Sequence, residues 1–202
     1  MNERVTATKQ GRLGEATQYL AEQRLDGLIA ASNGLNNFLE ANAVFVLSGV
    51  RPMGESAVVL DRDGRATLIV TPAWDEPRAA SLSATERTVG TDDLAATLKG
   101  VVGSHRLDLS RTLSAGLSML GAALHDRIAV ALGGLPAPAD ELARELARIR
   151  TPEELAAAER ARRWSPLAAW CRRTTSISSR PSTSSCGSRT CAPNAPAWPA
   201  VD

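Results

Sequence analysis

The chain contains 202 residues, of which 44% are hydrophobic, and its formal net charge is +1. This size and composition indicate a globular protein with one domain of ordinary size, and they give no sign of a nucleic-acid or membrane partner. The N-terminus lacks the apolar segment of a secretion signal and every cysteine lies after residue 163, so we expect a cytoplasmic protein.

The first fifty residues predict a helix followed by two strands. Apolar residues recur at helical spacing between residues 12 and 24, with charged residues on the opposite side. Residues 25–32, LDGLIAAS, form an apolar run that ends in a Ser-Asn-Gly turn and predict a buried strand. Residues 34–42 predict a short helix or a loop. The β-branched and aromatic residues of VFVLSG, residues 44–49, predict the second strand.

The clearest local signal in the sequence is a hairpin. Two runs rich in β-branched residues, 56–61 and 66–71, flank the pair Asp63-Gly64. Asp-Gly favours a tight turn between antiparallel strands. The segment therefore predicts two antiparallel neighbours in a sheet.

The sequence beyond the hairpin predicts alternating helices and short strands. Thr91, Asp92 and Asp93 provide an N-cap for a helix that runs through Lys99. We also expect helices at 74–83, 112–125 and 139–149, and strands at 87–90, at 105–110 and within 127–140. This alternation, with one hairpin inside it, predicts an α/β fold with a mixed central sheet covered by helices on both faces.

A well-formed helix start near residue 150 is followed by a sequence of different character. Thr151 is a suitable N-cap, Pro152 suits the first helical position and Glu154 can complete a capping box. Helical periodicity then ends near residue 163. We therefore assign residues 151–163 to a linker helix that follows a domain at 1–150.

Residues 164–202 differ from the rest of the chain in composition. They hold all three cysteines, three of the four tryptophans, five of the eleven prolines, and four arginines against the one acid, Asp202. Such a mixture is typical of a GC-rich coding sequence read out of frame, so we expect a change of reading frame near residues 161–166. A genuine disordered basic tail is the alternative interpretation.

The sequence up to residue 163 shows none of the familiar catalytic patterns. His105 and His125 lack the partner spacing of metal ligands, and we expect structural roles for both. Asp92 and Asp93 are paired carboxylates, which can divide acid and base work. They lie in the first turn of a predicted helix, however, where negative charge is favoured without catalysis.

The best candidate for a binding edge is the turn after the first predicted strand, where open α/β sheets place ligands. Asn36, Asn37 and Phe38 form a polar and aromatic turn there. Arg51 adds a guanidinium after the second predicted strand, and Trp74 adds a ring after the hairpin. A surface loop with satisfied side chains remains the alternative.

The order of the segments resembles the N-terminal domain of the creatinase, prolidase and aminopeptidase P family. The resemblance covers about residues 10–162. Its motifs are RLGEATQYLAEQRLDGLIAAS, NAVFVLSG, SAVVLDRDGRATLIVTPAWDEPRAA, TDDLAATL and RIRTPEELAAAERAR, of which Leu47-Ser48-Gly49 and Thr151-Pro152-Glu153-Glu154 are the most specific. The chain departs from the family pattern at Phe45 and Val46, where Tyr or Trp is common, at Val50, where Phe is common, and at Arg150, where Lys is usual.

The resemblance implies that chemistry takes place in a following catalytic domain of over two hundred residues. Two Asp, one His and two Glu there bind a pair of divalent metal ions, Mn, Co or Zn, in the peptidases, whereas creatinase-like members use no metal. No position after residue 163 matches these ligand motifs, so no catalytic or metal residue is carried over. The chain would then be inactive alone and lack its catalytic domain.

The resemblance also implies a role for the domain that is present. Such domains help the enzymes to dimerise and form part of the substrate entrance, so Asn36, Asn37, Phe38 and Arg51 would face that entrance. We expect self-association, since the surface normally covered by the catalytic domain would be exposed. A stand-alone α/β module that binds a small ligand or a protein is the alternative function, and a metal-free enzyme at the sheet edge is a third.

Overall fold

The computed structural model describes residues 3–34, 42–148, 155–156 and 158–161. The chain divides into two compact units, Met1–Ala157 and Ala158–Asp202. In the second unit the described residues, 158–161, are helical. The predicted helix cap at 151–154, the candidate turn at 36–38 and the tail at 164–202 lie outside the described residues.

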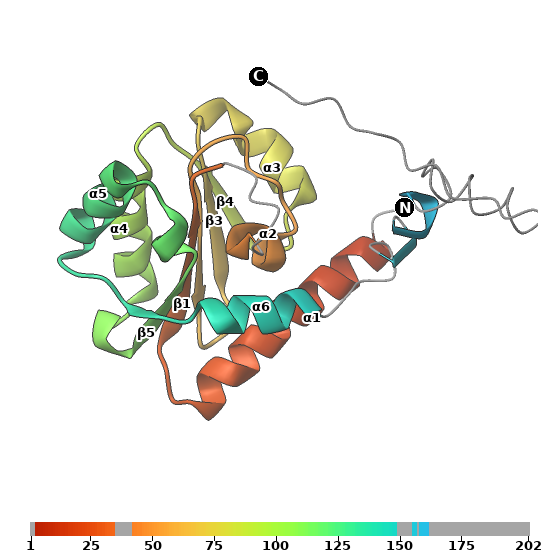
Figure 1. The fold of residues 1–202 in the computed structure, drawn as a ribbon, viewed down its shortest axis with the longest axis horizontal. Coiled ribbons are helices and arrows are strands. Elements are labelled where there is room, and N and C mark those ends of the chain that lie inside the picture. Colours follow the sequence, from red (N-terminus) through yellow and green to blue (C-terminus); the bar gives the residue numbers. More distant parts are fainter. Residues whose placement is uncertain (1–2, 35–41, 149–154, 157, 162–202) are drawn as a thin grey trace, which may run out of the picture. The chain divides into compact units, whose positions relative to one another are not determined.

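One six-stranded mixed sheet forms the centre of the first unit, in the order β4-β3-β2-β1-β5-β6. β2 is antiparallel to both of its neighbours, β1 and β3, whereas the other pairs are parallel. Five strands therefore share one direction, and their carboxyl ends meet at one edge (Figure 1). The strands are β1 (Gly27–Ser32), β2 (Ser56–Asp61), β3 (Ala66–Val70), β4 (Arg87–Gly90), β5 (Thr112–Ala115) and β6 (Ala137–Pro138).

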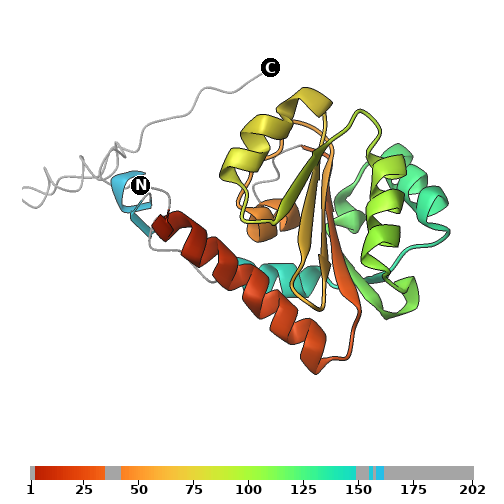
Figure 2. The ribbon, with the colours of Figure 1, turned by 180° about the vertical axis from the view of Figure 1, so that it is seen from behind.

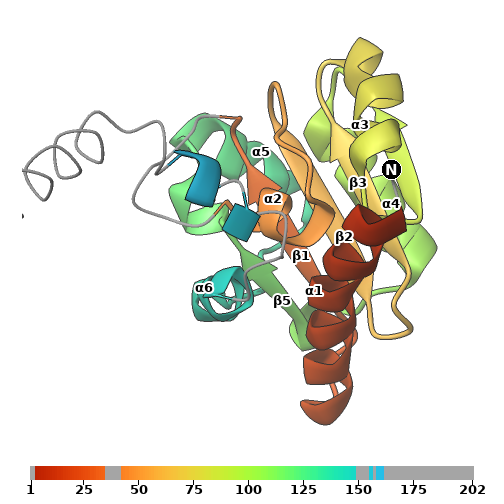
Figure 3. The same cartoon turned by 90° about the vertical axis from the view of Figure 1, so that its right-hand side faces the viewer.

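Helices cover both faces of this sheet, as the sequence predicts (Figures 1 and 2). One layer, which Figure 3 shows in front of the sheet, contains α1, α2 and α6, with α3 beside them. The opposite layer contains α4 and α5. The helices are α1 (Glu3–Glu22), α2 (Ala43–Ser48), α3 (Glu76–Leu82), α4 (Leu94–His105), α5 (Ala122–Leu132) and α6 (Asp140–Arg148).

Alternating side chains of the strands fill two separate cores. In β1, Leu28 and Ala30 pack towards α1 and α2, whereas Ile29 and Ala31 pack towards α4 and α5. Successive side chains of a strand point to opposite faces, so a strand that is buried on both faces is apolar throughout. This pattern explains why LDGLIAAS has no polar alternation. The predicted fold class, α/β with a mixed sheet between helices, is confirmed.

The prediction of a strand at 44–49 is wrong, because these residues form helix α2. The side chain of Asn42 caps the helix by accepting a hydrogen bond from the Phe45 N–H at 3.0 Å. Gly49 ends it with a positive φ of 71°, a conformation that glycine adopts without a steric penalty. Two capping residues seven positions apart therefore outweigh the β propensity of Val44 and Val46.

The predicted strand at 105–110 is also wrong. Helix α4 continues beyond Lys99 to His105, and Arg106 ends it in the left-handed conformation with φ 54°. Asp108 then caps a short 3-10 helix, Leu109–Arg111, and the strand begins only at Thr112.

The helix predicted at 112–125 is wrong in its first half. Thr112–Ala115 form β5, which pairs in parallel with β1. The helix of this region, α5, begins at Ala122 and ends at Leu132, and the short strand expected within 127–140 is the two-residue β6. The hairpin of β2 and β3, the strand β4 and the helix α6 agree with the predictions within two residues.

Candidate functional site

The carboxyl edge of the sheet carries the exposed aromatic and cationic side chains that the sequence singles out. Arg51 lies on the loop between α2 and β2, and Trp74 lies in the short 3-10 helix Ala73–Asp75 after β3. Trp74 is 68% exposed and Met53, on the same loop as Arg51, is 60% exposed. An exposed indole ring and an exposed thioether can contribute apolar contact area to a ligand or partner.

Arg51 is held by its neighbours although its side chain faces solvent. Its guanidinium carbon lies 5.4 Å from the centre of the Phe45 ring on α2, a cation–π geometry. Its carbonyl oxygen accepts a hydrogen bond from Nη2 of Arg78 at 3.1 Å. The loop is thus anchored while the charged group stays available.

Arg78 connects this loop to a buried carboxylate. Its Nε and Nη2 donate to the two oxygens of Asp75 at 2.5 and 2.7 Å, and the side chain of Asp75 is fully buried. The hydrogen bond to Asp75 raises the pKa of Arg78 above its ordinary value, and the nearby negative charge adds to this effect, whereas burial opposes it. The pair holds α3 against the loop that carries Arg51.

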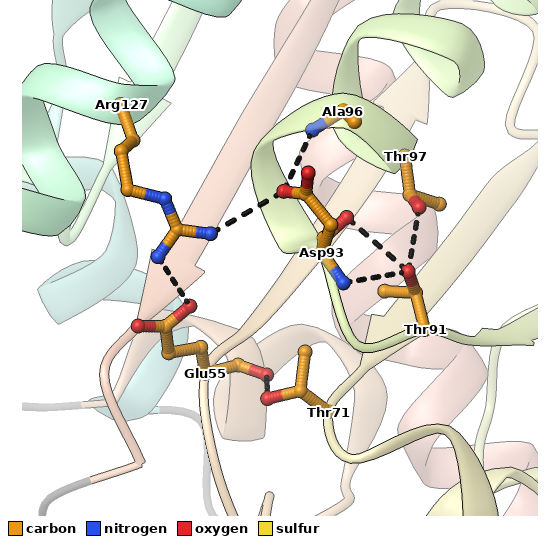
Figure 4. Close-up of polar contacts among 7 residues, drawn as sticks. All are labelled: Glu55, Thr71, Thr91, Asp93, Ala96, Thr97 and Arg127. Carbon is orange, nitrogen blue, oxygen red and sulfur yellow. Dashed lines mark hydrogen bonds and ion pairs between the residues drawn. The ribbon is translucent and has the colours of Figure 1, made fainter.

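A second ionic contact joins three loops at the same edge (Figure 4). Arg127 of α5 lies between Glu55, just before β2, and Asp93, the N-cap of α4, at 3.5 and 3.3 Å. The carbonyl of Glu55 accepts hydrogen bonds from the N–H and the hydroxyl of Thr71, at 3.0 and 2.7 Å. These contacts fix the loops before β2, after β3 and before α4 relative to one another.

The charge of Asp93 is stabilised mainly by the start of its own helix. Its carboxylate accepts the backbone N–H of Ala96, and this hydrogen bond lowers the pKa of Asp93 below its ordinary value. Desolvation opposes the shift, and Arg127 adds to the lowering. The side chain of Thr91 also accepts the N–H of Asp93 at 3.0 Å (Figure 4). Asp93 therefore has a capping role, as the sequence predicts.

A small cavity of about 150 Å³ lies where β1 and β5 end side by side. Gly116 forms part of its wall with a φ of 78°, and a Cβ at this position would come within 2.4 Å of the Ala31 carbonyl. Asp140 of α6 accepts hydrogen bonds from the Gly116 N–H and the Ser118 hydroxyl, both at 2.7 Å. These bonds give the carboxylate a structural role. The volume is below the roughly 300 Å³ of most ligand pockets.

At the opposite end of the sheet, a carboxylate contacts an imidazole, which in turn contacts a hydroxyl. His105 Nδ1 lies 3.0 Å from Asp61 Oδ2, and His105 Nε2 lies 3.0 Å from Thr67 Oγ1. This is the order of contacts in a catalytic triad. The sequence pattern does not predict these contacts, because His105 lies 44 residues after Asp61 and 38 residues after Thr67 and is expected in a strand.

The environment of these three residues indicates a structural role. Thr67 and Asp61 are 4% and 2% exposed, so a substrate has no access to the hydroxyl. Asp61 also accepts the side chain of Arg65 at 2.8 Å and the N–H groups of Asp63 and Arg65 at 3.0 Å. The carboxylate therefore holds the β2–β3 turn, and the ring of His105 joins that turn to the end of α4.

The predicted site residues are brought together only in part. Arg51 lies at the expected edge, and Asn36, Asn37 and Phe38 lie outside the described residues. His125, expected in the last turn of a helix, lies near the start of α5, with Nδ1 3.4 Å from Asp126 Oδ1.

Metal ligands do not gather in the described part of the chain. Among these residues, no group of three or more His, Cys, Asp or Glu side chains is arranged to hold a metal ion. The described residues therefore offer no site for a metal pair, which the sequence resemblance assigns to a following catalytic domain. A helix long and apolar enough to cross a membrane is likewise absent from the described residues.

No family model and no curated protein matches the chain. Solved structures do match it. An aminopeptidase P from Streptococcus thermophilus superposes with a TM-score of 0.54 at 14% identity, covering 69% of this chain and 98% of that one. A prolidase from Pyrococcus horikoshii gives 0.53 at 14% identity, covering 72% of this chain but only 37% of the prolidase.

The match to an isolated domain identifies which part of those enzymes the fold corresponds to. The N-terminal creatinase/prolidase-like domain of a Corynebacterium diphtheriae protein superposes with a TM-score of 0.50 at 14% identity, covering 65% of this chain and 98% of that one. At such identities the likeness establishes the fold. The chain has the mixed α/β fold of the N-terminal creatinase/prolidase-like domain, in agreement with the sequence resemblance.

Proposed function

We propose that residues 1–150 are the non-catalytic N-terminal domain of an Xaa-Pro peptidase or creatinase-like hydrolase. The observation that carries this proposal is the superposition on an isolated N-terminal domain over nearly its full length. Enclosure of the triad-like cluster Asp61–His105–Thr67 supports a role without bond cleavage. The catalytic steps would belong to a separate domain that supplies the metal ions where the parent enzyme uses them.

Within that enzyme, we assign the carboxyl edge of the sheet to the substrate entrance. Arg51 would meet an anionic group of the substrate there, and the exposed rings and thioethers of Trp74 and Met53 would contact its apolar part. Asn36, Asn37 and Phe38 follow β1 in the sequence, and we assign them to the same entrance.

DNA sequencing across codons 155–170, read onward in the other two frames, tests the link to a catalytic domain. We expect one alternative frame to continue with the two Asp, one His and two Glu of a metal-dependent member, or with the corresponding metal-free domain. Frames that all lack such a domain would contradict the proposal.

The protein translated in the corrected reading frame, with its catalytic domain, would then serve to test the role of Arg51. Arg51→Ala should raise KM for the substrate several-fold with little change in kcat, because the side chain contributes binding rather than chemistry. Arg87→Ala, which removes an exposed arginine of β4, is the matched control and should leave KM unchanged. An equal fall in kcat and kcat/KM for Arg51→Ala would argue against an entrance role.

A stand-alone binding module remains the second candidate function, favoured by the exposure of Met53, two residues after Arg51, and of Trp74, which follows β3. It predicts a ligand that raises the Tm of the 202-residue chain, an effect that Arg51→Ala abolishes. Metabolite screening by thermal shift separates the two functions, since an isolated entrance domain should show no such ligand.

A further inference from the structure

The turn that follows β1 contains Asn33-Gly34, the only Asn-Gly pair in the sequence. Strand pairing of β1 ends at Ser32, so the Gly34 nitrogen lies outside the hydrogen-bond ladder of the sheet. Its N–H donates to Ser32 Oγ at 3.2 Å, which is at the long end of the range for such a bond. Asn33 and Gly34 are both half-buried, so they remain partly exposed to water. The fold therefore holds the Gly34 nitrogen only weakly.

Glycine is required at position 34 by the packing of two turns. Gly34 has a φ of 76°, and a Cβ there would lie 2.7 Å from the carbonyl oxygen of Gly54, on the loop before β2. Glycine accepts both the positive φ and the close approach because it has no side chain. For the same reason nothing shields its backbone nitrogen. The packing thus gives Asn33 the neighbour whose nitrogen is the most accessible.

The side-chain amide of Asn33 and the backbone nitrogen of Gly34 can react with each other. Once it has lost its proton, the nitrogen is a nucleophile that can attack Cγ of Asn33. The new N–Cγ bond closes a cyclic succinimide, the Cγ–Nδ2 bond breaks, and the amide nitrogen leaves as ammonia. Water then opens the ring: cleavage at Cγ gives aspartate, and cleavage at the backbone carbonyl gives isoaspartate. The net change consumes water and releases ammonia, with no oxidant or reductant.

We propose that Asn33 is a site of spontaneous deamidation that modifies the carboxyl edge of the sheet. The reaction needs only water and the close-packed glycine that the fold places after Asn33. It is slower in the folded chain than in the unfolded one, because the packing limits the motion that brings the Gly34 nitrogen to Cγ. This inference is independent of the proposed function.

The modification has a structural consequence at this edge. Isoaspartate lengthens the main chain by a methylene group and leaves a free carboxylate, whereas the contact of Gly34 with Gly54 has no room even for a Cβ. Gly54 also packs closely on the turn after β3, since a Cβ on Gly54 would lie 2.8 Å from the Thr71 carbonyl oxygen. Deamidation therefore loosens the contacts among the three turns and adds a negative charge beside the loop that carries Arg51.

Peptide mapping by liquid chromatography and mass spectrometry tests the reaction. The purified 202-residue chain is incubated in mildly alkaline buffer, both folded and unfolded in urea. In the folded chain, the peptide with Asn33 should convert to its aspartate and isoaspartate forms at least about tenfold faster than the peptide with Asn42, because Asn42 precedes Ala43 rather than a glycine. Conversion should slow in mildly acidic buffer, where the nitrogen keeps its proton.

Thermal melts of the incubated samples test the structural consequence. The Tm of the wild type should fall as the converted fraction rises. Asn33→Gln is the matched control, because its longer side chain closes a ring much more slowly. The Tm of this variant should stay constant during the same incubation. Even if Asn33→Gln fails to fold, peptide mapping of the wild type decides whether the reaction takes place.

The outcomes separate the reaction from its consequence. An Asn33 that stays intact in the folded chain, or that converts no faster than Asn42, overturns the proposed site, whether or not the chain in urea reacts. Conversion at Asn33 without a fall in Tm, or an equal fall in the Asn33→Gln variant, overturns the loosening of the edge. None of these results bears on the fold or on the entrance role of Arg51.

Discussion

The two ends of the sheet use similar residue types in different ways. At the end where β2 passes into β3, Asp61, His105 and Thr67 are enclosed and each polar group has a partner. At the carboxyl edge, Arg51 and Trp74 face solvent and only the loops beneath them are fixed. Triad-like contacts alone are therefore no sign of catalysis, since a reactive group needs access as well as partners.

The largest effect on stability should come from the end of the sheet that holds the enclosed cluster of Asp61, His105 and Thr67. Asp61→Ala removes the acceptor of two N–H groups and two side chains, and leaves His105 and the turn without their partner. We expect the free energy of unfolding to fall by about 3 kcal/mol, as measured by urea denaturation.

Asp63→Ala on the same turn is the matched control, because the side chain of Asp63 is exposed. It should change stability by less than about 0.5 kcal/mol. Equal losses of stability in the two variants would show that the contacts of Asp61 do not stabilise this end of the sheet.

An intermediate effect on stability is expected for α2, the helix that the sequence predicts as a strand. Asn42→Ala removes the cap of α2 and the hydrogen bond of Asn42 Nδ2 to Ser32 Oγ at 3.0 Å. Loss of an N-cap costs about 1 kcal/mol, which urea denaturation can resolve.

Asn42→Asp keeps an acceptor for the Phe45 N–H and loses only the donor to Ser32. Its loss of stability should therefore be smaller than that of Asn42→Ala. A larger loss for Asp would mean that the contact with Ser32, and not the cap, dominates at this position.

The smallest effect on stability is expected for Asp93 at the carboxyl edge, and it depends on pH. Its pKa is lowered in the folded chain, so ionised Asp93 stabilises the fold above its ordinary pKa of 3.8, and this contribution is lost as pH falls through the folded pKa. Asp93→Asn keeps a side chain that can cap α4 but removes the charge. Its Tm should lie slightly below that of the wild type at pH 7.

The difference between these two Tm values should shrink as pH falls below 3.8 and vanish only below the lowered pKa of Asp93 in the folded chain, where both side chains are neutral. Thermal melts from pH 7 to pH 3 check this. A difference that persists in acid would mean that the amide fails as a cap, and that the charge of Asp93 is not the cause.

The parts of the fold that the sequence predicts are those with strong local signals. Asp63-Gly64 between β-branched runs defines the hairpin, and the uniformly apolar β1 reveals a strand buried on both faces. Helix α2 was mistaken for a strand because its valines favour strands, although Asn42 and Gly49 carry the capping signal of a short helix.

The site was harder to predict than the fold. Arg51 lies at the carboxyl edge because it precedes β2, the antiparallel strand that begins there, whereas the sequence placed it there through a strand at 44–49 that is in fact α2. The contacts of Asp61 with His105 span 44 residues and arise from the packing of α4 on the β2–β3 hairpin. Likewise, the packing of α5 depends on where this helix begins, and Ala122 lies inside a helix predicted ten residues too early.

The central claim is that this domain contains no reactive centre. The most direct test measures the hydrolysis of Xaa-Pro dipeptides by the purified 202-residue chain and by its Asp61→Asn variant, each supplied with Mn²⁺, Co²⁺ or Zn²⁺. We predict no turnover above background for either protein. Turnover by the wild type that Asp61→Asn abolishes in a still folded chain would contradict the account, because it would make the enclosed cluster a catalytic site.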